Sequence, residues 1–187
     1  LAPIDRFGGE NCGSWWLGED EDFFVLKMLD KLIETVVKER NITEIYFWGS
    51  SMGGFGALLH GSRHKAKGIY ANIPQVRLLG SDYSNNQEMH KFFKHIMKPD
   101  NTYNDVTNFI PKDSNTHFFI NQSAETYPNY VEQQYLYLLD HLLKLPDAKV
   151  WAELLPLSGH SLTRRMTDSV TKMLTYCNTD DYNTILK

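Results

Sequence analysis

The chain has 187 residues, of which 42% are hydrophobic and 22% charged, and its formal net charge is −4 at pH 7. A chain of this length and composition is expected to fold as one globular domain over residues 1–187, with a substantial hydrophobic core. The small negative charge gives no sign of a nucleic-acid-binding surface. No apolar stretch approaches the ~20 residues that cross a bilayer.

The cysteine content bears on the cellular compartment. Cys12 and Cys177 are too few for a disulfide framework, which favours a reducing compartment. No signal peptide is recognisable before Leu1. We therefore expect a cytoplasmic protein without a nucleic-acid partner or a membrane span, and the composition leaves its oligomeric state open.

The expected elements alternate between strand and helix. In chain order they are a strand ending at residues 1–5, a helix over about 23–40, a strand at 44–48, a helix to about 64, a strand at 68–73, a strand at 116–121, a helix over 130–143, a strand at 149–155 and a helix over about 161–176. This alternation predicts an α/β fold with a mostly parallel sheet, covered by helices on both faces.

One long connection interrupts the alternation. Residues 74–115 show no sustained hydrophobic period and carry polar clusters with short helical pieces, such as the one predicted over 88–97. A connection of this length inside a compact domain is usually functional. We therefore expect a lid or a binding insertion at about 74–115.

The segment Gly49-Ser50-Ser51-Met52-Gly53-Gly54 carries the most specific signal in the chain. It matches the G-x-S-x-G pattern, with a predicted strand before it and a small-residue helix start after it, which is the context of a nucleophile elbow. Such a turn exposes the serine hydroxyl at the strand tip, and small neighbours let strand and helix approach closely. The pattern predicts Ser51 as a catalytic nucleophile. An ordinary glycine-rich turn is the alternative, but it does not explain why glycine or serine fills every position except Met52.

A serine nucleophile requires a base, and His160 follows the last predicted strand. In the elbow architecture the histidine comes last in the chain, and parallel strands place their carboxyl ends at one sheet edge. Ser51 and His160 are therefore expected to meet, although a loop or helix-capping histidine is the alternative. His60 and His64 are spaced like a metal pair, but no glutamate of an H-E-x-x-H motif lies between them, and we interpret them as surface residues.

The acid that orients the histidine is expected after the penultimate strand. Glu125 is the only carboxylate in the loop at 122–128, so we assign it this role. The alternative is an acid that merely lies near the start of the following helix, where the helix dipole favours it. Asp82, in the insertion, is a weaker candidate for the catalytic acid.

Two further groups of residues are assigned to the site. The backbone N–H of Met52 is expected to donate to the oxyanion, and Gly9, in the glycine-rich loop at 6–16, is the candidate second donor. Trp15 and Trp16 in that loop are expected to line an acyl or sugar pocket together with Tyr127. A plain surface turn with buried aromatic residues is an equal alternative for the loop.

From the strand at 44–48 to the final helix, these motifs resemble the α/β-hydrolase superfamily. More loosely, the extended elbow with Gly54-Phe55-Gly56-Ala57, the tryptophan-rich loop and the tyrosine-rich acid loop resemble bacterial surface-glycan proteins. Those include capsular-polysaccharide O-acetyltransferases and accessory-secretion proteins that acetylate glycoproteins. A full member of the superfamily has strands before the one ending at Asp5. The chain is therefore either a minimal version of the fold or the carboxyl-terminal part of a larger protein.

The expected activity is acyl transfer through an acyl-serine. Water as the acceptor makes an esterase, whereas a sugar hydroxyl makes an O-acyltransferase, and the same residues serve both reactions. A peptidase or a thioesterase belongs to the same class. No metal or organic cofactor is implied, although acyl-CoA is a candidate donor for a transferase. The contrasting hypothesis is a non-catalytic, hydrolase-like scaffold or binding module of a larger assembly.

Overall fold

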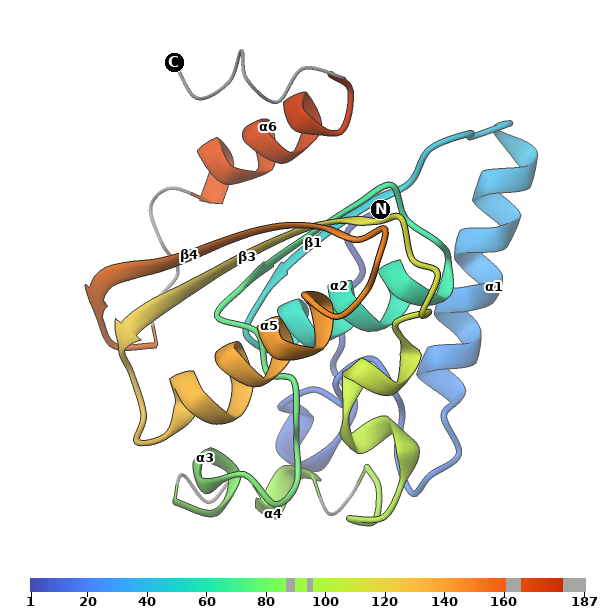
Figure 1. Cartoon of the computed structure of the whole chain (residues 1–187). Coiled ribbons are helices and arrows are strands. Elements are labelled where there is room, and N and C mark those ends of the chain that lie inside the picture. The colour runs from blue at the N-terminus through green and yellow to red at the C-terminus, as the bar shows by residue number, and fades with distance from the viewer. Residues whose placement is uncertain (87–89, 94–95, 161–165, 180–187) are drawn as a thin grey trace.

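The computed structural model describes residues 1–86, 90–93, 96–160 and 166–179. Four parallel strands form one sheet in the order β1-β2-β3-β4, which confirms the predicted α/β class with a parallel sheet (Figure 1). The strands are β1 (Tyr46–Ser50), β2 (Gly68–Asn72), β3 (His117–Glu125) and β4 (Lys149–Ser158). The helices are η1 (Gly9–Asn11), α1 (Phe24–Glu39), α2 (Met52–Arg63), α3 (Asp82–Asn86), α4 (His90–Phe93), η2 (Thr102–Asn104), η3 (Val106–Phe109), η4 (Val131–Leu136), α5 (Tyr137–Leu142) and α6 (Met166–Tyr176).

Helices cover both faces of the sheet, as the alternation predicts. Helices α2 and α5 lie on one face and α6 lies on the other (Figure 1). The larger core fills the first face and includes Phe55, Leu58, Ile69, Phe118 and Leu138. A smaller cluster under α6 contains Tyr70, Phe119, Met173, Tyr176 and Cys177. Within the described ranges, every helix is too short or too polar to span a bilayer.

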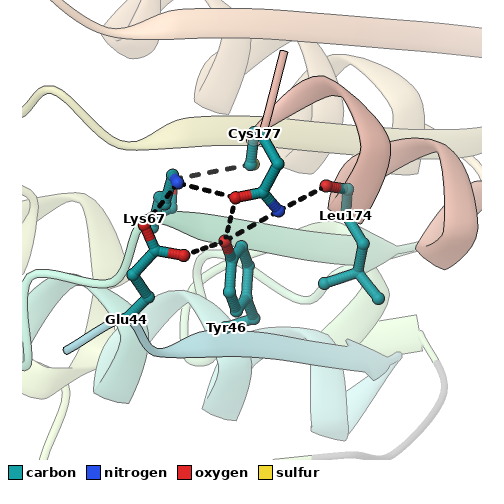
Figure 2. Close-up of polar contacts among 6 residues, drawn as sticks. Glu44, Tyr46, Lys67, Leu174 and Cys177 are labelled. Atoms are coloured by element: carbon teal, nitrogen blue, oxygen red, sulfur yellow. Dashed lines mark hydrogen bonds and ion pairs between the residues drawn. The ribbon is translucent and has the colours of Figure 1, made fainter. Parts of the chain in front are cut away.

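Hydrogen bonds and an ion pair connect the end of α6 to the amino ends of β1 and β2 (Figure 2). Lys67 Nζ donates to Glu44 Oε1 at 2.5 Å and to Asn178 Oδ1 at 2.8 Å. The Tyr46 hydroxyl donates to Glu44 Oε2 at 2.9 Å. Burial raises the pKa of the adjacent Cys177 thiol to about 11, so this sulfur stays protonated and unreactive at neutral pH.

The first residues differ from the prediction. Residues 1–5 form no strand. Instead, the buried carboxylate of Asp5 accepts hydrogen bonds from the backbone N–H groups of Phe7, Ser14 and Trp16 at 3.2, 2.7 and 2.8 Å. An extended segment becomes a strand only when it pairs with another, and here the acidic side chain organises the following loop.

The carboxyl ends of the last two strands extend beyond their predicted limits. β3 and β4 pair with each other as far as Glu125 and Ser158, because each continues to find a partner after the hydrophobic pattern ends. The residues predicted as the acid-bearing loop, 122–125, are therefore strand. Of the helix predicted over 88–97, residues 90–93 form α4 and residues 96–97 are not helical. Of the helix predicted over 161–176, residues 166–176 form α6. Residues 87–89, 94–95 and 161–165 lie outside the described ranges.

Candidate active site

The carboxyl ends of the four strands lie at one edge of the sheet. The register pairs Ser50 with Asn72, Asn72 with Asn121, and Asn121 with Glu153. Segments that leave these strands therefore converge on one region, the usual ligand site of open parallel sheets. They include the turn at Ser51, the connection after β2, the tyrosine-rich segment after β3 and the loop after β4.

The turn at Ser51 has the strained geometry of an elbow. Ser51 adopts φ 54° and ψ −117°, a conformation that costs about 1–3 kcal/mol for a non-glycine residue. Its N–H donates to the Asn72 carbonyl at 2.9 Å, and its own carbonyl accepts from Gly54 N–H at 2.9 Å. A Cβ on Gly49 would collide with the backbone of Gly53. The close crossing of β1 and α2 therefore requires glycine at position 49.

His160 meets Ser51 across this edge. The Nε2 atom of His160 lies 2.7 Å from Ser51 Oγ, although 109 residues separate them in the chain. The loop that carries the imidazole is held from β3, because Gly159 N–H donates to the Glu125 backbone carbonyl at 2.6 Å. The structure thus brings the predicted nucleophile and the predicted base into hydrogen-bonding contact.

Three tyrosine rings surround the imidazole of His160. Tyr83 stacks on it with the ring centroids 6.1 Å apart and the planes 19° apart, while Tyr127 and Tyr130 lie at 5.6 and 5.3 Å. Hydrogen bonds fix two of these rings: Gln75 Nε2 donates to the Tyr83 hydroxyl, and the Tyr130 hydroxyl bonds to two backbone carbonyls just after β2. Burial lowers the pKa of His160 below its ordinary value. The imidazole is therefore neutral at pH 7 and can accept a proton.

The structure does not bring the predicted acid to this histidine. The Glu125 side chain is exposed, because β3 continues through this residue, which pairs with Ser158. Among the described residues, no group bonds the buried Nδ1 atom of His160. The Asp82 carboxylate accepts instead from the side-chain amides of Asn129 and Gln133, at 2.6 and 3.1 Å. Glu125 contributes to the site through its backbone carbonyl, which accepts the hydrogen bond from Gly159 N–H. A search of the sequence for carboxylates cannot reveal a backbone contact of this kind.

Met52, the predicted oxyanion donor, directly follows Ser51 in the chain. It is the first residue of α2, so its N–H is one of the four helix-start amides without an intrahelical acceptor. In the early loop, Gly13 packs against the Met52 side chain. Gly9, the predicted second donor, instead lies in a shallow polar hollow with Glu19 and Asp20. The structure therefore places a different part of that loop beside the elbow.

The two tryptophans of the early loop have separate surroundings. Trp15 is only 2% exposed, packs edge-on against Phe93 and donates from Nε1 to Gln75 Oε1, so it belongs to the core rather than to the wall of an open pocket. Trp16 packs over Gly56 on α2 and lines an apolar groove of about 560 Å³ between α1 and β1. Neither Ser51 nor His160 lines this groove. Of the three predicted pocket residues, Tyr127 is the one that contacts the His160 ring.

The prediction that His60 and His64 are surface residues is wrong. His60 is 3% exposed, and both rings contact Asp30 of α1. Helix α1 covers this side of α2, and a carboxylate contributed 30 residues earlier in the chain cannot be recognised from the spacing of the two histidines.

Comparison with known proteins identifies the fold. No family model and no curated protein sequence matches the chain. Among solved structures, a capsule O-acetyltransferase of Neisseria meningitidis serogroup A aligns with TM-score 0.63 and 19% identity over 90% of this chain and 69% of its own. An S-formylglutathione hydrolase from Agrobacterium tumefaciens aligns with TM-score 0.59 and 16% identity over 88% and 62% of the two chains.

The fold is that of the α/β-hydrolases. An acylaminoacyl peptidase of Pyrococcus horikoshii is similar as well, with TM-score 0.63 and 17% identity over 89% of this chain and 30% of the peptidase. The chain thus spans about two thirds of the first two of these structures and less than a third of the peptidase. At such low identities the likeness establishes the architecture, which agrees with the resemblance in the sequence, and the chemistry must be argued from the site.

Proposed function

We propose that this protein transfers acyl groups through a covalent acyl-Ser51 intermediate, as an acyl-ester hydrolase or an O-acyltransferase. The observation that carries the proposal is the 2.7 Å contact between Ser51 Oγ and His160 Nε2 at a strained strand-to-helix turn. A weak nucleophile becomes reactive when a neutral base lies within hydrogen-bonding reach of it, and burial keeps this imidazole neutral by lowering its pKa.

In the proposed reaction, Ser51 Oγ attacks the carbonyl carbon of the acyl donor while its proton passes to His160 Nε2. The Met52 N–H stabilises the oxyanion. Collapse of the tetrahedral intermediate breaks the bond to the leaving group, which takes the proton from His160. The oxygen of an acceptor hydroxyl then attacks the acyl carbon while His160 takes the acceptor's proton. Collapse of this second tetrahedral intermediate breaks the bond between the acyl carbon and Ser51 Oγ, which takes the proton from His160, and the acylated acceptor leaves.

The acceptor decides between the two activities. Water yields hydrolysis, and a hydroxyl of a glycan yields O-acylation. The structural neighbours include both kinds of enzyme, since a capsule O-acetyltransferase, a carboxylesterase and a ferulic acid esterase share the fold. One structure of the capsule O-acetyltransferase contains CoA, which supports acyl-CoA as a donor to test alongside simple esters. Exclusion of water from the acyl-enzyme would favour transfer.

The test is labelling of the serine with a fluorophosphonate probe, followed by intact mass spectrometry. The wild-type protein is expected to gain one adduct, and Ser51→Ala is expected to gain none. Ser50→Ala is the matched control, because the Ser50 hydroxyl bonds to Asn72 Nδ2 at 2.8 Å rather than to the base. His160→Ala should slow labelling by at least ~100-fold. Acylation with p-nitrophenyl acetate or acetyl-CoA, then a chase with water or candidate sugars, identifies the acceptor.

A non-catalytic scaffold is the second candidate. The observation in its favour is that no described residue bonds the Nδ1 atom of His160, since active triads hold that atom with a carboxylate. The same labelling experiment separates the two functions. A folded wild-type protein that gains no adduct would support the scaffold and exclude the acyl-serine mechanism.

A further inference from the structure

A cluster of metal-binding side chains joins α1 to the carboxyl-terminal end of α2. Asp30 Oδ1 lies 3.4 Å from His60 Nδ1 and 2.9 Å from His64 Nε2. The three donor atoms all lie within 4.8 Å of one another. The side chains of His60, His64 and Asp30 are 4%, 12% and 16% exposed, so the cluster is largely shielded from solvent.

The spacing of the two histidines in the sequence explains why their rings lie next to each other. Residues four apart on a helix lie on the same face, and the rings of His60 and His64 stack with their planes 18° apart. Both imidazoles direct a nitrogen at the same carboxylate oxygen. Arg63 occupies the other oxygen, with NH2 2.5 Å from Asp30 Oδ2.

This charge arrangement keeps the carboxylate ionised. Although burial raises the pKa of Asp30, hydrogen bonds from His60, Arg63 and His64 outweigh that effect and hold it well below its ordinary value. An ionised carboxylate is the protonation state that a metal ligand requires.

We propose that Asp30, His60 and His64 form a zinc-binding site. Zinc binds imidazole nitrogen and carboxylate oxygen at about 2.0–2.2 Å in tetrahedral sites, which places neighbouring ligand atoms roughly 3.3–3.5 Å apart. The separations of 2.9 and 3.4 Å between Asp30 Oδ1 and the two nitrogens are close to these values, and the donor atoms of the two histidines lie within 4.8 Å of each other. Asp30 Oδ1, His60 Nδ1 and His64 Nε2 supply three ligands and water completes the set, while Arg63 orients the carboxylate from its other oxygen.

The site lies apart from the proposed acyl chemistry. Ser51 precedes the first residue of α2 and His60 lies nine residues later, which corresponds to about 13 Å along a helix axis. The ion would instead bridge α1 and α2 beside the apolar groove, whose lining includes residues of α1 and His60 of α2. Its predicted effect is on the stability of this helix pair rather than on the attack by Ser51.

The experiment measures zinc affinity and stoichiometry by competition with a chromophoric chelator. The protein is prepared without a histidine tag, and the background is Cys12→Ser because Cys12 is an exposed free thiol and cysteine sulfur is a common zinc ligand. One zinc ion per chain is expected. Asp30→Asn and His64→Gln should each weaken its binding at least 100-fold, whereas His141→Gln, a half-buried histidine outside the cluster, should leave it within twofold. Co²⁺ should show the visible absorption of a four-coordinate site in the Cys12→Ser background and in His141→Gln, but not in Asp30→Asn or His64→Gln.

Arg63→Gln adds a test that leaves all three ligands in place. Removing the guanidinium takes away a competing positive charge but also the contact that orients the carboxylate, so zinc should still bind, with its affinity lowered by at most about 100-fold. A mere ion-pair cluster would instead lose stability and bind no metal. The proposal is overturned if the wild type binds no zinc, or if His64→Gln, folded by circular dichroism, binds it as tightly as the wild type. If His64→Gln and Asp30→Asn do not fold, absence of zinc binding in Arg63→Gln likewise overturns it.

Discussion

Substitution of Gly49 by alanine tests how the elbow positions Ser51. A Cβ at this position would lie closer than 3.0 Å to the Gly53 backbone, a separation that real Cβ atoms essentially never show, whereas ordinary contacts begin at 3.4 Å. Strand β1 and helix α2 would therefore have to separate by at least 0.4 Å, the difference between these two values. The clash is with backbone, so no side-chain rotation relieves it.

Two effects of the Gly49→Ala change follow. Overpacking of this kind costs about 1–3 kcal/mol of unfolding free energy. A misplacement of 1 Å between reacting groups lowers reaction rates by about 100-fold, so for a shift of at least 0.4 Å we expect fluorophosphonate labelling of Ser51 to slow by about 10-fold or more. Urea unfolding and the time course of adduct formation measure the two quantities separately.

Gly53→Ala is the matched control. A Cβ on Gly53 meets nothing within 4 Å, and alanine favours the helix over glycine by up to about 1 kcal/mol. This variant should label at a rate within about threefold of the wild type and should be no less stable. Wild-type labelling and stability in Gly49→Ala would refute the idea that close approach of the two backbones positions the serine.

Three further predictions concern the imidazole and the pH response. Glu125→Gln should change p-nitrophenyl acetate turnover less than about threefold, because this carboxylate is exposed; a loss near 10⁴-fold, as when an orienting acid is neutralised, would restore it as the third triad member. Tyr83→Leu should lower turnover at least tenfold by removing the ring stacked on His160, whereas Tyr83→Phe keeps the ring and should retain most activity. The third prediction concerns His117, whose pKa is lowered to about 4 by burial and by the charges of Lys149 and Lys67. Between about pH 4 and 6.5 this residue therefore binds more protons in the unfolded chain than in the folded one. The unfolding free energy should therefore fall as the pH drops through this window, and His117 should account for about 1–2 kcal/mol of the fall between pH 7 and pH 5. Urea titrations at several pH values should show a smaller fall for His117→Gln than for the wild type.

The features that local sequence predicts are those set by backbone geometry and hydrophobic periodicity. The glycines and serines around Ser51 admit only a tight strand-to-helix crossing, and the strand–helix alternation implies a parallel sheet with its carboxyl ends together. From these two facts the meeting of Ser51 and His160 follows without coordinates. Strand ends were predicted less well, because β3 and β4 extend by pairing with each other rather than by their own periodicity.

Tertiary structure decided the surroundings of those two residues. The rings of Tyr83, Tyr127 and Tyr130 come from two connections more than 40 residues apart in the chain, and Glu125 faces solvent because its strand continues. Asp30 reaches His60 and His64 only because α1 packs beside α2. The sequence by itself determined the parallel sheet and the serine elbow, since these depend on neighbouring residues. What surrounds the imidazole and the histidine pair depends on packing between distant segments, which no local pattern encodes.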